Sequence, residues 1–258
     1  MKKISLILLL ITTILGFSAC GDELILESVS DLASLRVGAV GTTYGEIYAN
    51  ECGSENVIIY NTVEEASDAL AANEVDCIIT DLNTAKTVAS ARDDITTTET
   101  RIIDSIEFCA AVRTDDFDTL AVAEVVTSEL EKETDFSKLC RGMIENTGKD
   151  REDFITDSQV GSSGIFTLGV IVNNSPYVFK ASDGSIEGIS VEYAKHFAAK
   201  RDQTLVIKTY ESKTALSNAL KAGEIDVYFR EMPLPASPGI SYTTTCYTAE
   251  LRVLIADK

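Results

Sequence analysis

The chain has 258 residues, of which 41 are acidic and 22 are basic, and its formal net charge is −19. A surface this acidic repels nucleic acid and anionic lipid headgroups, which argues against a role in binding polyanions. The length is enough for one large domain or for two smaller lobes.

The first residues have the order of a secretory signal. Lys2 and Lys3 form a short positive segment, and residues 4–16 follow as an apolar run interrupted by a few hydroxyl side chains. This run is too short to cross a bilayer comfortably, which favours a cleaved signal over a transmembrane anchor. We therefore expect residues 1–19 to be a signal peptide and the mature protein to be extracytoplasmic.

A lipid anchor is predicted at Cys20. The run from Phe17 to Cys20 resembles a bacterial lipobox, although Phe17 stands where Leu is more usual. The resemblance implies cleavage before Cys20 and lipidation of its thiol, with residues 20–34 as the tether to the cell membrane. The alternative is an ordinary signal peptide in which Cys20 is incidental.

The remaining cysteines and the single histidine give no sign of a metal site. The cysteines contain no C-x-x-C pair and no zinc spacing, and an odd number cannot be fully paired within one chain. We interpret them as structural thiols, and we expect His196 to pack on a helix or face solvent. No metal and no cofactor is predicted. These five cysteines are Cys52, Cys77, Cys109, Cys140 and Cys246.

Short apolar runs alternate with helical patterns through residues 35–113, which predicts a parallel α/β unit. Strands are expected over residues 35–40, 57–60, 75–79, 102–103 and 107–113, with helices between the first three.

The period changes in residues 114–148. Apolar side chains recur there at spacings of three and four, and Gly148 marks the end of the pattern. This predicts two consecutive helices with no strand between them. Residues 149–164 are polar and contain a Gly-Ser-Ser-Gly run, so they are predicted to be a linker.

A second α/β unit is predicted over residues 165–258. Strands are expected over residues 165–172, 176–180, 205–208, 225–229 and 251–256, with helices around residues 191–198 and 216–220. One segment of this unit repeats a segment of the first: residues 69–76 (ALAANEVD) and 219–226 (ALKAGEID) are identical at five of eight positions. Both predict a helix, a tight turn and an acidic residue before a strand. Two lobes of similar construction follow, unless the likeness is a coincidence between common units.

The repeated unit belongs to a wider resemblance. Residues 165–258 resemble the first lobe of the type II periplasmic solute-binding proteins, specifically the amino-acid-binding family. That resemblance is carried by residues 175–179 (SPYVF), 183–192 (DGSIEGISVE) and 240–247 (ISYTTTCY). Residues 35–43 (LRVGAVGTT) and 75–81 (VDCIITD) resemble segments of the family's second lobe. Residues 114–148 resemble the closing helices that pack on lobe 1.

The order of these parts differs from that of the family, in which lobe 1 comes first. Here the order is lobe 2 (35–113), closing helices, linker and lobe 1 (165–258). The fold class predicted is therefore α/β, a two-lobed periplasmic-binding-protein-like fold of type II, circularly permuted with lobe 2 first. This permutation predicts one covalent strand between the lobes, near residues 112–116, and a second crossing where Leu35 and Ile255 lie end to end at the hinge. The rival is a pair of partial modules that complete each other between two chains.

Lobe 2 offers three candidate ligand-binding residues. Thr42 and Thr43 lie at a strand-to-helix junction, where hydroxyls and free backbone N–H groups suit an anionic ligand group. Asp81 ends a strand, and by resemblance it is the carboxylate that pairs with a ligand's α-ammonium. The alternative for all three residues is helix capping.

Lobe 1 lacks the family's carboxylate-binding arginine, because Pro238 stands at the place where the T-x-x-R turn puts it. The aromatic residue that stacks on the ligand in the family aligns with Asn174. Arg230 and its neighbour Glu231 are the remaining candidates for ligand contacts at a strand end. Alternatively, Arg230 pairs with Glu231 or with a surface carboxylate.

The function implied is that of an extracytoplasmic solute-binding lipoprotein. It would capture a small, amino-acid-like polar metabolite as a monomer, with an ABC permease as its partner. A ligand-sensing or accessory lipoprotein that has lost transport-type binding is the alternative; genomic neighbours would separate the two. Some relatives of this fold are dehydratases, but we expect no catalysis, since no acid–base pair, nucleophile motif or phosphate-binding loop is evident.

Overall fold

A computed structural model describes Leu24, Leu26 and residues 28–145, 157–172, 174–232 and 237–257, with the backbone alone for residues 103, 104 and 230–232. The predicted signal peptide, Cys20 and the linker's residues 149–156 lie outside these residues. No described helix is both long enough and apolar enough to cross a membrane.

Lobe 2 is built from the N-terminal elements. After the 3-10 helix η1 (Val29–Ser34) they are β1 (Arg36–Val40), α1 (Tyr44–Glu51), β2 (Asn56–Tyr60), α2 (Val63–Ala71), β3 (Cys77–Asp81) and α3 (Leu82–Ala91). Thr62 begins α2 by accepting a hydrogen bond from the backbone of Glu65. All five residues of β3 are buried, as expected for a central strand covered on both faces.

The rest of the chain forms the crossing strands, the two predicted helices and lobe 1. In order these elements are β4 (Ile95–Arg113), α4 (Phe117–Leu130), α5 (Thr134–Glu145), β5 (Ile165–Val170), β6 (Phe179–Lys180), β7 (Ile186–Glu187), α6 (Ile189–Lys200), β8 (Thr204–Thr209), α7 (Lys213–Lys221), β9 (Tyr228–Met232) and β10 (Ile240–Ala256). The strand predicted over residues 176–180 is confined to β6, which pairs with β7 in a small hairpin.

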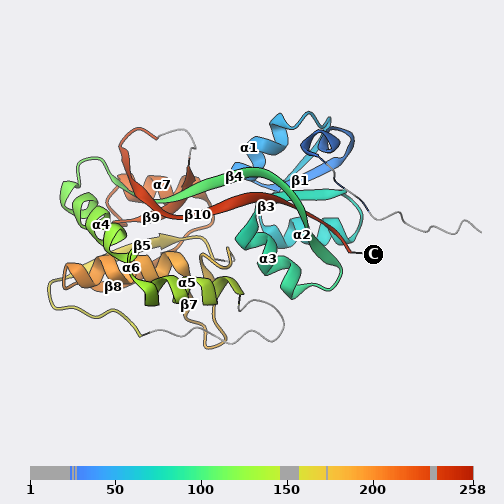
Figure 1. Cartoon of the computed structure of the whole chain (residues 1–258). Helices are drawn as coiled ribbons and strands as arrows, with labels where there is room; N and C mark the ends of the chain where they lie inside the picture. The colour runs from blue at the N-terminus through green and yellow to red at the C-terminus, as the bar shows by residue number, and fades with distance from the viewer. Residues whose placement is uncertain are drawn as a thin grey trace, which may run out of the picture.

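One six-stranded sheet runs through both lobes in the order β2-β1-β3-β10-β4-β9. In lobe 1, β5 pairs with β8 in parallel, and a single bridge between Leu168 and Val227 joins β5 to the chain that leads into β9. Figure 1 shows lobe 1 with α4, α6 and α7 on the left and lobe 2 with α1, α2 and α3 on the right.

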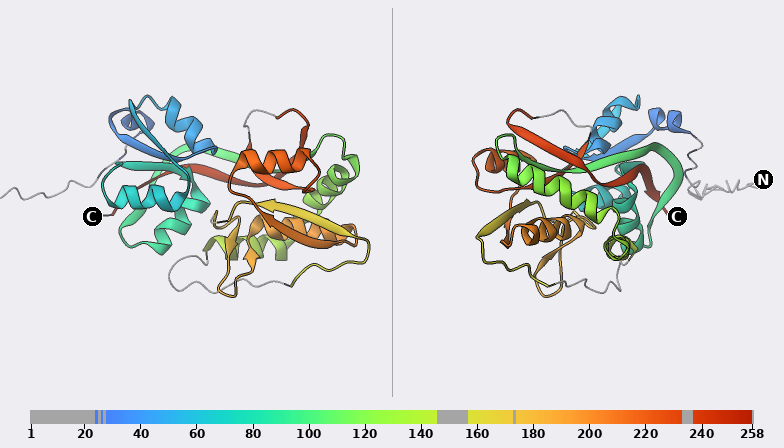
Figure 2. Two further views of the ribbon diagram at one scale, coloured as in Figure 1. Left: turned by 180° about the vertical axis from the view of Figure 1, so that it is seen from behind. Right: turned by 60° about the vertical axis from the view of Figure 1, so that its left-hand side comes forward.

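Two strands cross between the lobes, and both are continuous. β4 and β10 are antiparallel along their length, from Ile240 opposite Arg113 to Ala256 opposite Ile95. The two strands lie side by side between the lobes in both views of Figure 2. The prediction of a single covalent crossing was therefore wrong. Short apolar runs suggested separate strands at 102–103, 107–113 and 251–256, whereas the polar residues between them extend the same strands.

The ends of the two crossing strands belong to different lobes. β4 pairs with β9 at one end, and β10 pairs with β3 at the other, where Ile255 lies opposite Cys77. The predicted boundaries need this correction, because the last residues of the 165–258 unit complete the sheet of lobe 2. Val37 also lies opposite Cys77, on the other side of β3. The segment that enters at Leu35 and the end of β10 at Ile255 therefore flank β3 at the outer edge of lobe 2, and they do not lie end to end at the hinge.

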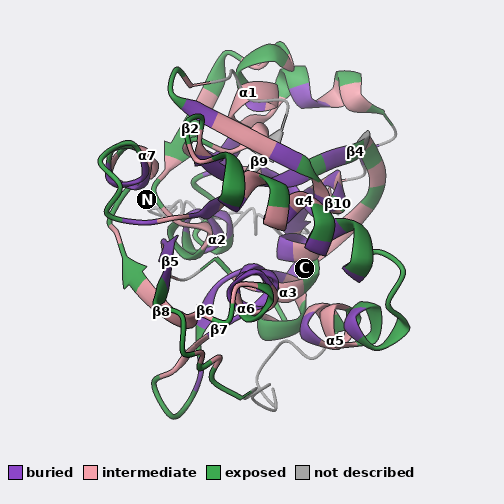
Figure 3. Ribbon diagram, turned by 90° about the vertical axis from the view of Figure 1, so that its left-hand side faces the viewer, coloured by how far each residue is buried: buried purple, intermediate pink, exposed green. Residues whose placement is uncertain are grey.

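The main hydrophobic core follows these shared strands. It contains Val37 and Cys77 from lobe 2, Ile106 and Ala110 from β4, and Phe166 from lobe 1. In Figure 3 the buried residues gather on the strands, while the outer faces of the helices are exposed. α5 packs on α6 through Phe136, whose ring meets the His196 ring edge-on at a centroid distance of 5.3 Å.

The repeated segment forms the same structure in each lobe. Each helix is followed, two residues after its end, by a residue with positive φ, Asn73 at 58° and Gly223 at 72°. The aspartate three residues further on clamps the first strand of its lobe: Asp76 accepts from the backbone N–H of Arg36 at 2.8 Å, and Asp226 accepts from that of Thr167 at 2.7 Å. The strand carbonyl in turn accepts from the backbone N–H of each aspartate at 2.8 Å.

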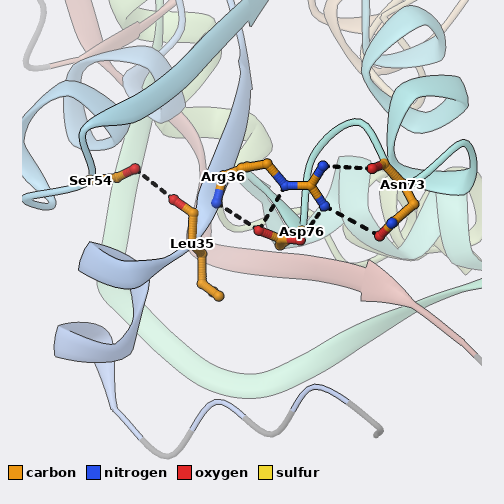
Figure 4. A network of polar contacts seen from close by, with 5 residues as sticks. All are labelled: Leu35, Arg36, Ser54, Asn73 and Asp76. Carbon is orange, nitrogen blue, oxygen red and sulfur yellow. Dashed lines mark hydrogen bonds and ion pairs between the residues drawn. The ribbon is translucent and has the colours of Figure 1, made fainter. Parts of the chain in front are cut away.

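The clamp in lobe 2 is reinforced by an ion pair. Figure 4 shows the Arg36 guanidinium between the Asp76 carboxylate and two oxygens of Asn73. The shortest of these contacts joins Arg36 Nη2 and Asp76 Oδ1 at 2.5 Å, and the hydrogen bond to Asp76 raises the pKa of Arg36 above its ordinary value. The same figure shows Ser54 donating to the carbonyl of Leu35 at 2.6 Å.

We expect Asp226→Ala to destabilise the protein by about 1–3 kcal/mol, because it leaves the backbone N–H of buried Thr167 without an acceptor. Urea denaturation at neutral pH measures this loss. Asp257→Ala, at an exposed position just after β10, is the matched control and should change stability by less than about 0.5 kcal/mol. Equal losses in the two variants would contradict the clamp.

Candidate functional site

A cavity of about 330 Å³ lies between the lobes. It opens where β1 and β3 of lobe 2 and β5 of lobe 1 end, the edge of an α/β sheet at which ligands commonly bind. Its polar lining in lobe 2 comprises Thr42, Thr43, Tyr60, Asn61, Thr62, Thr80, Asp81 and Thr84. Its polar lining in lobe 1 comprises Asn174, Tyr177, Ser190, Glu211, Ser212, Lys213, Thr214 and Tyr247.

Four of the six predicted ligand-binding residues line this cavity. Thr42, Thr43 and Asp81 reach it from lobe 2, and Asn174 reaches it from lobe 1, so the fold brings together residues that are far apart in sequence. The backbone of β9 places Arg230 opposite Cys109 and Glu231 opposite Phe108. The side chains of Arg230 and Glu231 lie outside the described part of the structure.

The threonines at the start of α1 serve the helix as well as the cavity. Thr43 is the N-cap residue: its hydroxyl accepts from the backbone N–H of Glu46 at 3.3 Å and donates to the carbonyl of Val40 at 2.7 Å. Thr42 has a φ of 61°, and its backbone N–H donates to the Glu46 carboxylate. The capping alternative therefore accounts for Thr43, whereas the exposed Thr42 turns toward the cavity mouth.

Asp81 caps α3 from the floor of the cavity. Its Oδ1 accepts hydrogen bonds from the backbone N–H groups of Asn83 and Thr84, each at 3.0 Å. The same oxygen accepts from the hydroxyl of Tyr177 at 2.6 Å, and this contact joins lobe 2 to lobe 1. The residue predicted to hold a ligand's ammonium is thus already hydrogen-bonded to the opposite lobe.

Tyr177 is the site residue that sequence reasoning missed. It lies in the SPYVF segment, but the predicted aromatic contact was sought at the position of Asn174. Its ring packs against both Phe108 of β4 and Tyr247 of β10, at centroid distances of 4.6 and 5.0 Å, and these two rings also contact each other at 4.6 Å. Because both neighbours belong to the crossing strands, Tyr177 is held at the point where the lobes meet.

The backbone of Tyr177 is fixed by the turn that begins α6. Ser190 donates its backbone N–H to the Tyr177 carbonyl at 3.1 Å. Gly188 has a φ of 132°, and a Cβ at this position would lie 2.3 Å from the same carbonyl oxygen. Only glycine fits this close approach, so the DGSIEG segment contributes to the site by positioning Tyr177.

Burial controls the charge at this contact. Asp81 is 6% exposed, and desolvation raises its pKa above the ordinary value, while hydrogen bonds from Thr84 and Tyr177 oppose the rise. Tyr177 is 2% exposed, and burial together with the charge of Asp81 raises the pKa of its phenol well above the usual range. The phenol therefore remains neutral and acts as a hydrogen-bond donor.

A second contact between the lobes lies at the cavity mouth. Lys213, in the first turn of α7, donates its ammonium to the backbone carbonyl of Thr42. Charged groups in the described lining are therefore Lys213 and Glu211 from lobe 1 and Asp81 from lobe 2. Among the described residues, no cluster of His, Cys, Asp or Glu could hold a metal ion.

We expect Asp81→Asn to fold and to match or exceed the parent in stability at pH 7, since the amide oxygen can still cap α3 and accept from Tyr177. Because the folded pKa of Asp81 is raised, its ionised form weakens the fold at neutral pH. That penalty disappears as the pH falls through the folded pKa toward about 4, so the parent should gain stability relative to the variant on acidification.

Chemical denaturation at several pH values measures the difference between parent and variant. Asp183→Asn is the control of opposite sign, because a hydrogen bond from Ser185 lowers the pKa of the exposed Asp183. The stabilisation from Asp183 is present above its ordinary pKa and is lost as the pH falls through the lowered value. A parallel trend in the two variants would contradict the assignment at Asp81.

Residues 166–236 match the family described as bacterial extracellular solute-binding proteins, family 3. The matched segment covers most of lobe 1 but well under half of the chain. No curated protein sequence matches the chain.

Several solved structures match most of the chain at low sequence identity and with TM-scores below 0.5. The ligand-binding core of GluR0 in complex with L-glutamate shares 10% identity at a TM-score of 0.47, covering 87% of this chain and 85% of its own. The ancestral amino-acid-binding protein AncCDT-1, a precursor of cyclohexadienyl dehydratase, and the periplasmic VFT2 domain of Bordetella pertussis BvgS each share 12% identity. Their TM-scores are 0.43 and 0.42, and each match covers 88% of this chain and 83% of the other. The chain has a mixed α/β fold, and its residues 166–236 match the solute-binding proteins of family 3.

Proposed function

We propose that this protein is an extracytoplasmic solute-binding lipoprotein that captures a small, amino-acid-like polar metabolite between its lobes and delivers it to an ABC permease. The observation that carries the proposal is the cavity of about 330 Å³ at the strand ends of both lobes. Its size falls within the range of small-molecule sites, and its lining mixes apolar walls with a few polar groups, as such sites do.

The proposed ligand contacts come from both lobes. Thr42 and Thr43 offer a hydroxyl and backbone groups from lobe 2, and Asn174 offers an exposed amide from lobe 1. Arg230 and Glu231, near the end of β9, are the proposed charged contacts. Asp81 can receive a ligand ammonium only if the Tyr177 hydroxyl leaves Oδ1.

Binding would draw the lobes together about the crossing strands. β4 and β10 connect lobe 1 to lobe 2 as one antiparallel pair. Bending of this pair is therefore the motion that opens the cavity. The contacts from Lys213 to Thr42 and from Tyr177 to Asp81 lie on the cavity side of the pair, where opening would separate them.

The lipid anchor at Cys20 and the permuted order belong to the same proposal. The carbonyl of Leu26 accepts from Thr100 at 2.6 Å, and Asp257 donates its backbone N–H to the carbonyl of Asp94 at 2.8 Å. Both ends of the described chain therefore lie along the lobe 2 half of β4. An anchor that precedes Leu26 would hold lobe 2 nearest the membrane.

A ligand present at about 100 times its Kd adds about 2.7 kcal/mol of stability. For a chain of this size that corresponds to a rise in Tm of about 5–10 °C. We therefore expect a screen of amino acids and small organic acids at millimolar concentration to contain at least one compound that raises Tm by several degrees. Isothermal titration should confirm a single site.

The matched variants are Asn174→Ala, which alters the cavity lining, and Asn218→Ala, which alters an exposed position of α7 outside it. The first should reduce the shift produced by the active compound, and the second should leave it unchanged. Absence of any shift across the screen would refute the transport proposal.

A further inference from the structure

The carboxylate of Asp81 has its hydrogen bonds supplied by the protein itself. Oδ1 alone accepts from two backbone N–H groups and from Tyr177, and the side chain of Thr84 adds a further hydrogen bond. An ionised carboxylate has about four acceptor positions. Oδ1 already has three donors, so an ammonium that approached this oxygen would have to displace one of them, and Tyr177 is the donor that faces the cavity from the opposite lobe.

The orientation of the Tyr177 hydroxyl is fixed. Asn83 donates its side-chain N–H to the phenolic oxygen at 3.2 Å, so the phenolic proton is the one that points to Asp81, at 2.6 Å. The amide and the carboxylate both come from lobe 2 and hold the phenol from two sides. The hydroxyl thus occupies the place beside Asp81 that a ligand's ammonium would need.

While the lobes are closed, Tyr177 cannot leave this place at low cost. The ring is 2% exposed and packs against both Phe108 and Tyr247, and its backbone carbonyl is confined by Gly188 and Ser190. A rotated ring would leave a gap beside these two aromatic neighbours and would leave Asp81 without its shortest hydrogen bond. An ammonium buried in the cavity without a charged acceptor would in turn be strongly disfavoured.

Lys213 is the positively charged side chain in the described part of the lining. Its ammonium lies at the cavity mouth, where it donates to the backbone carbonyl of Thr42. An ammonium near Lys213 would be repelled, whereas a carboxylate would be attracted. Glu211 lies on the exposed side of the lining, next to the first turn of α7.

We propose that Tyr177 is a specificity-determining residue that excludes an α-ammonium group, so that the cavity selects small organic acids of amino-acid size that lack this group. The inference rests on the proposed function, since it names the ligand class of the same cavity. Under this proposal Asp81 positions Tyr177 and caps α3, and it does not bind the ligand.

Matched ligand pairs test the inference directly. Each pair joins an amino acid to the acid in which hydrogen replaces the α-ammonium: L-glutamate with glutarate, L-leucine with 4-methylpentanoate, and L-phenylalanine with 3-phenylpropanoate. Affinities are measured by isothermal titration on the full-length parent, on Tyr177→Phe and on Tyr247→Phe. Tyr247 is the matched control, because its hydroxyl pairs with Ser190 at 3.1 Å while its ring belongs to the same stack.

We expect the parent to bind the deamino member of at least one pair at least about ten-fold more tightly than the amino acid, a difference of about 1.4 kcal/mol. Tyr177→Phe should shift this ratio toward the amino acid by at least about ten-fold, because Asp81 then lacks its donor from lobe 1. Tyr247→Phe should leave the ratio unchanged.

The outcomes separate this inference from the proposed function. A parent that prefers the amino acid would uphold solute capture and overturn the exclusion of the ammonium. An unchanged ratio in Tyr177→Phe would reduce Tyr177 to a contact that merely holds the lobes together, and would also overturn it. No binding of any probe by the parent or by Tyr177→Phe would overturn the proposed function and this inference together.

Discussion

Neither lobe can complete its sheet without β4 and β10, and every other feature of the molecule follows from this sharing. The two strands supply the inner edge of each lobe, the centre of the main core and the floor of the cavity. Phe108 on β4 and Tyr247 on β10 hold the Tyr177 ring. A change in the angle between the lobes therefore changes the distance between Tyr177 and Asp81.

The aspartate clamps show how one structural unit was used twice. Each clamp ties the turn after a helix to the first strand of its lobe, which fixes the distance between neighbouring strands and hence the place where they end. The lobes then differ in how they reinforce the clamp. Lobe 2 adds Arg36, whereas lobe 1 has Thr167 at the same position. The geometry of the cavity edge depends on backbone contacts that both lobes retain.

Local patterns predicted the local structure well. The spacing of apolar residues indicated the consecutive helices α4 and α5, and the repeat indicated two lobes of the same construction. The long strands were missed because residues 96–105 and 241–248 are rich in threonine and other polar residues, which gives a strand no apolar run to reveal it. Their strand conformation is imposed by pairing with each other, which is a tertiary effect.

The site was only partly predictable for the same reason. Strand ends identified Thr42 and Asp81, because the end of a parallel strand is a local feature. The contact between Asp81 and Tyr177 joins positions 96 residues apart and depends on the stack that the crossing strands create. No spacing within either segment could indicate it.

The place of β10 also has a consequence for how the chain folds. This strand follows every other described strand in the sequence, yet it lies in the interior of the sheet, between β3 and β4. A nascent chain that has formed β1, β2 and β3 therefore exposes an open strand edge until β10 has been synthesised. Such an edge invites pairing with other chains, and closing it by so distant a segment is slow. The interval before β10 pairs with β3 is therefore the stage of folding at which the chain is most exposed to pairing with other chains.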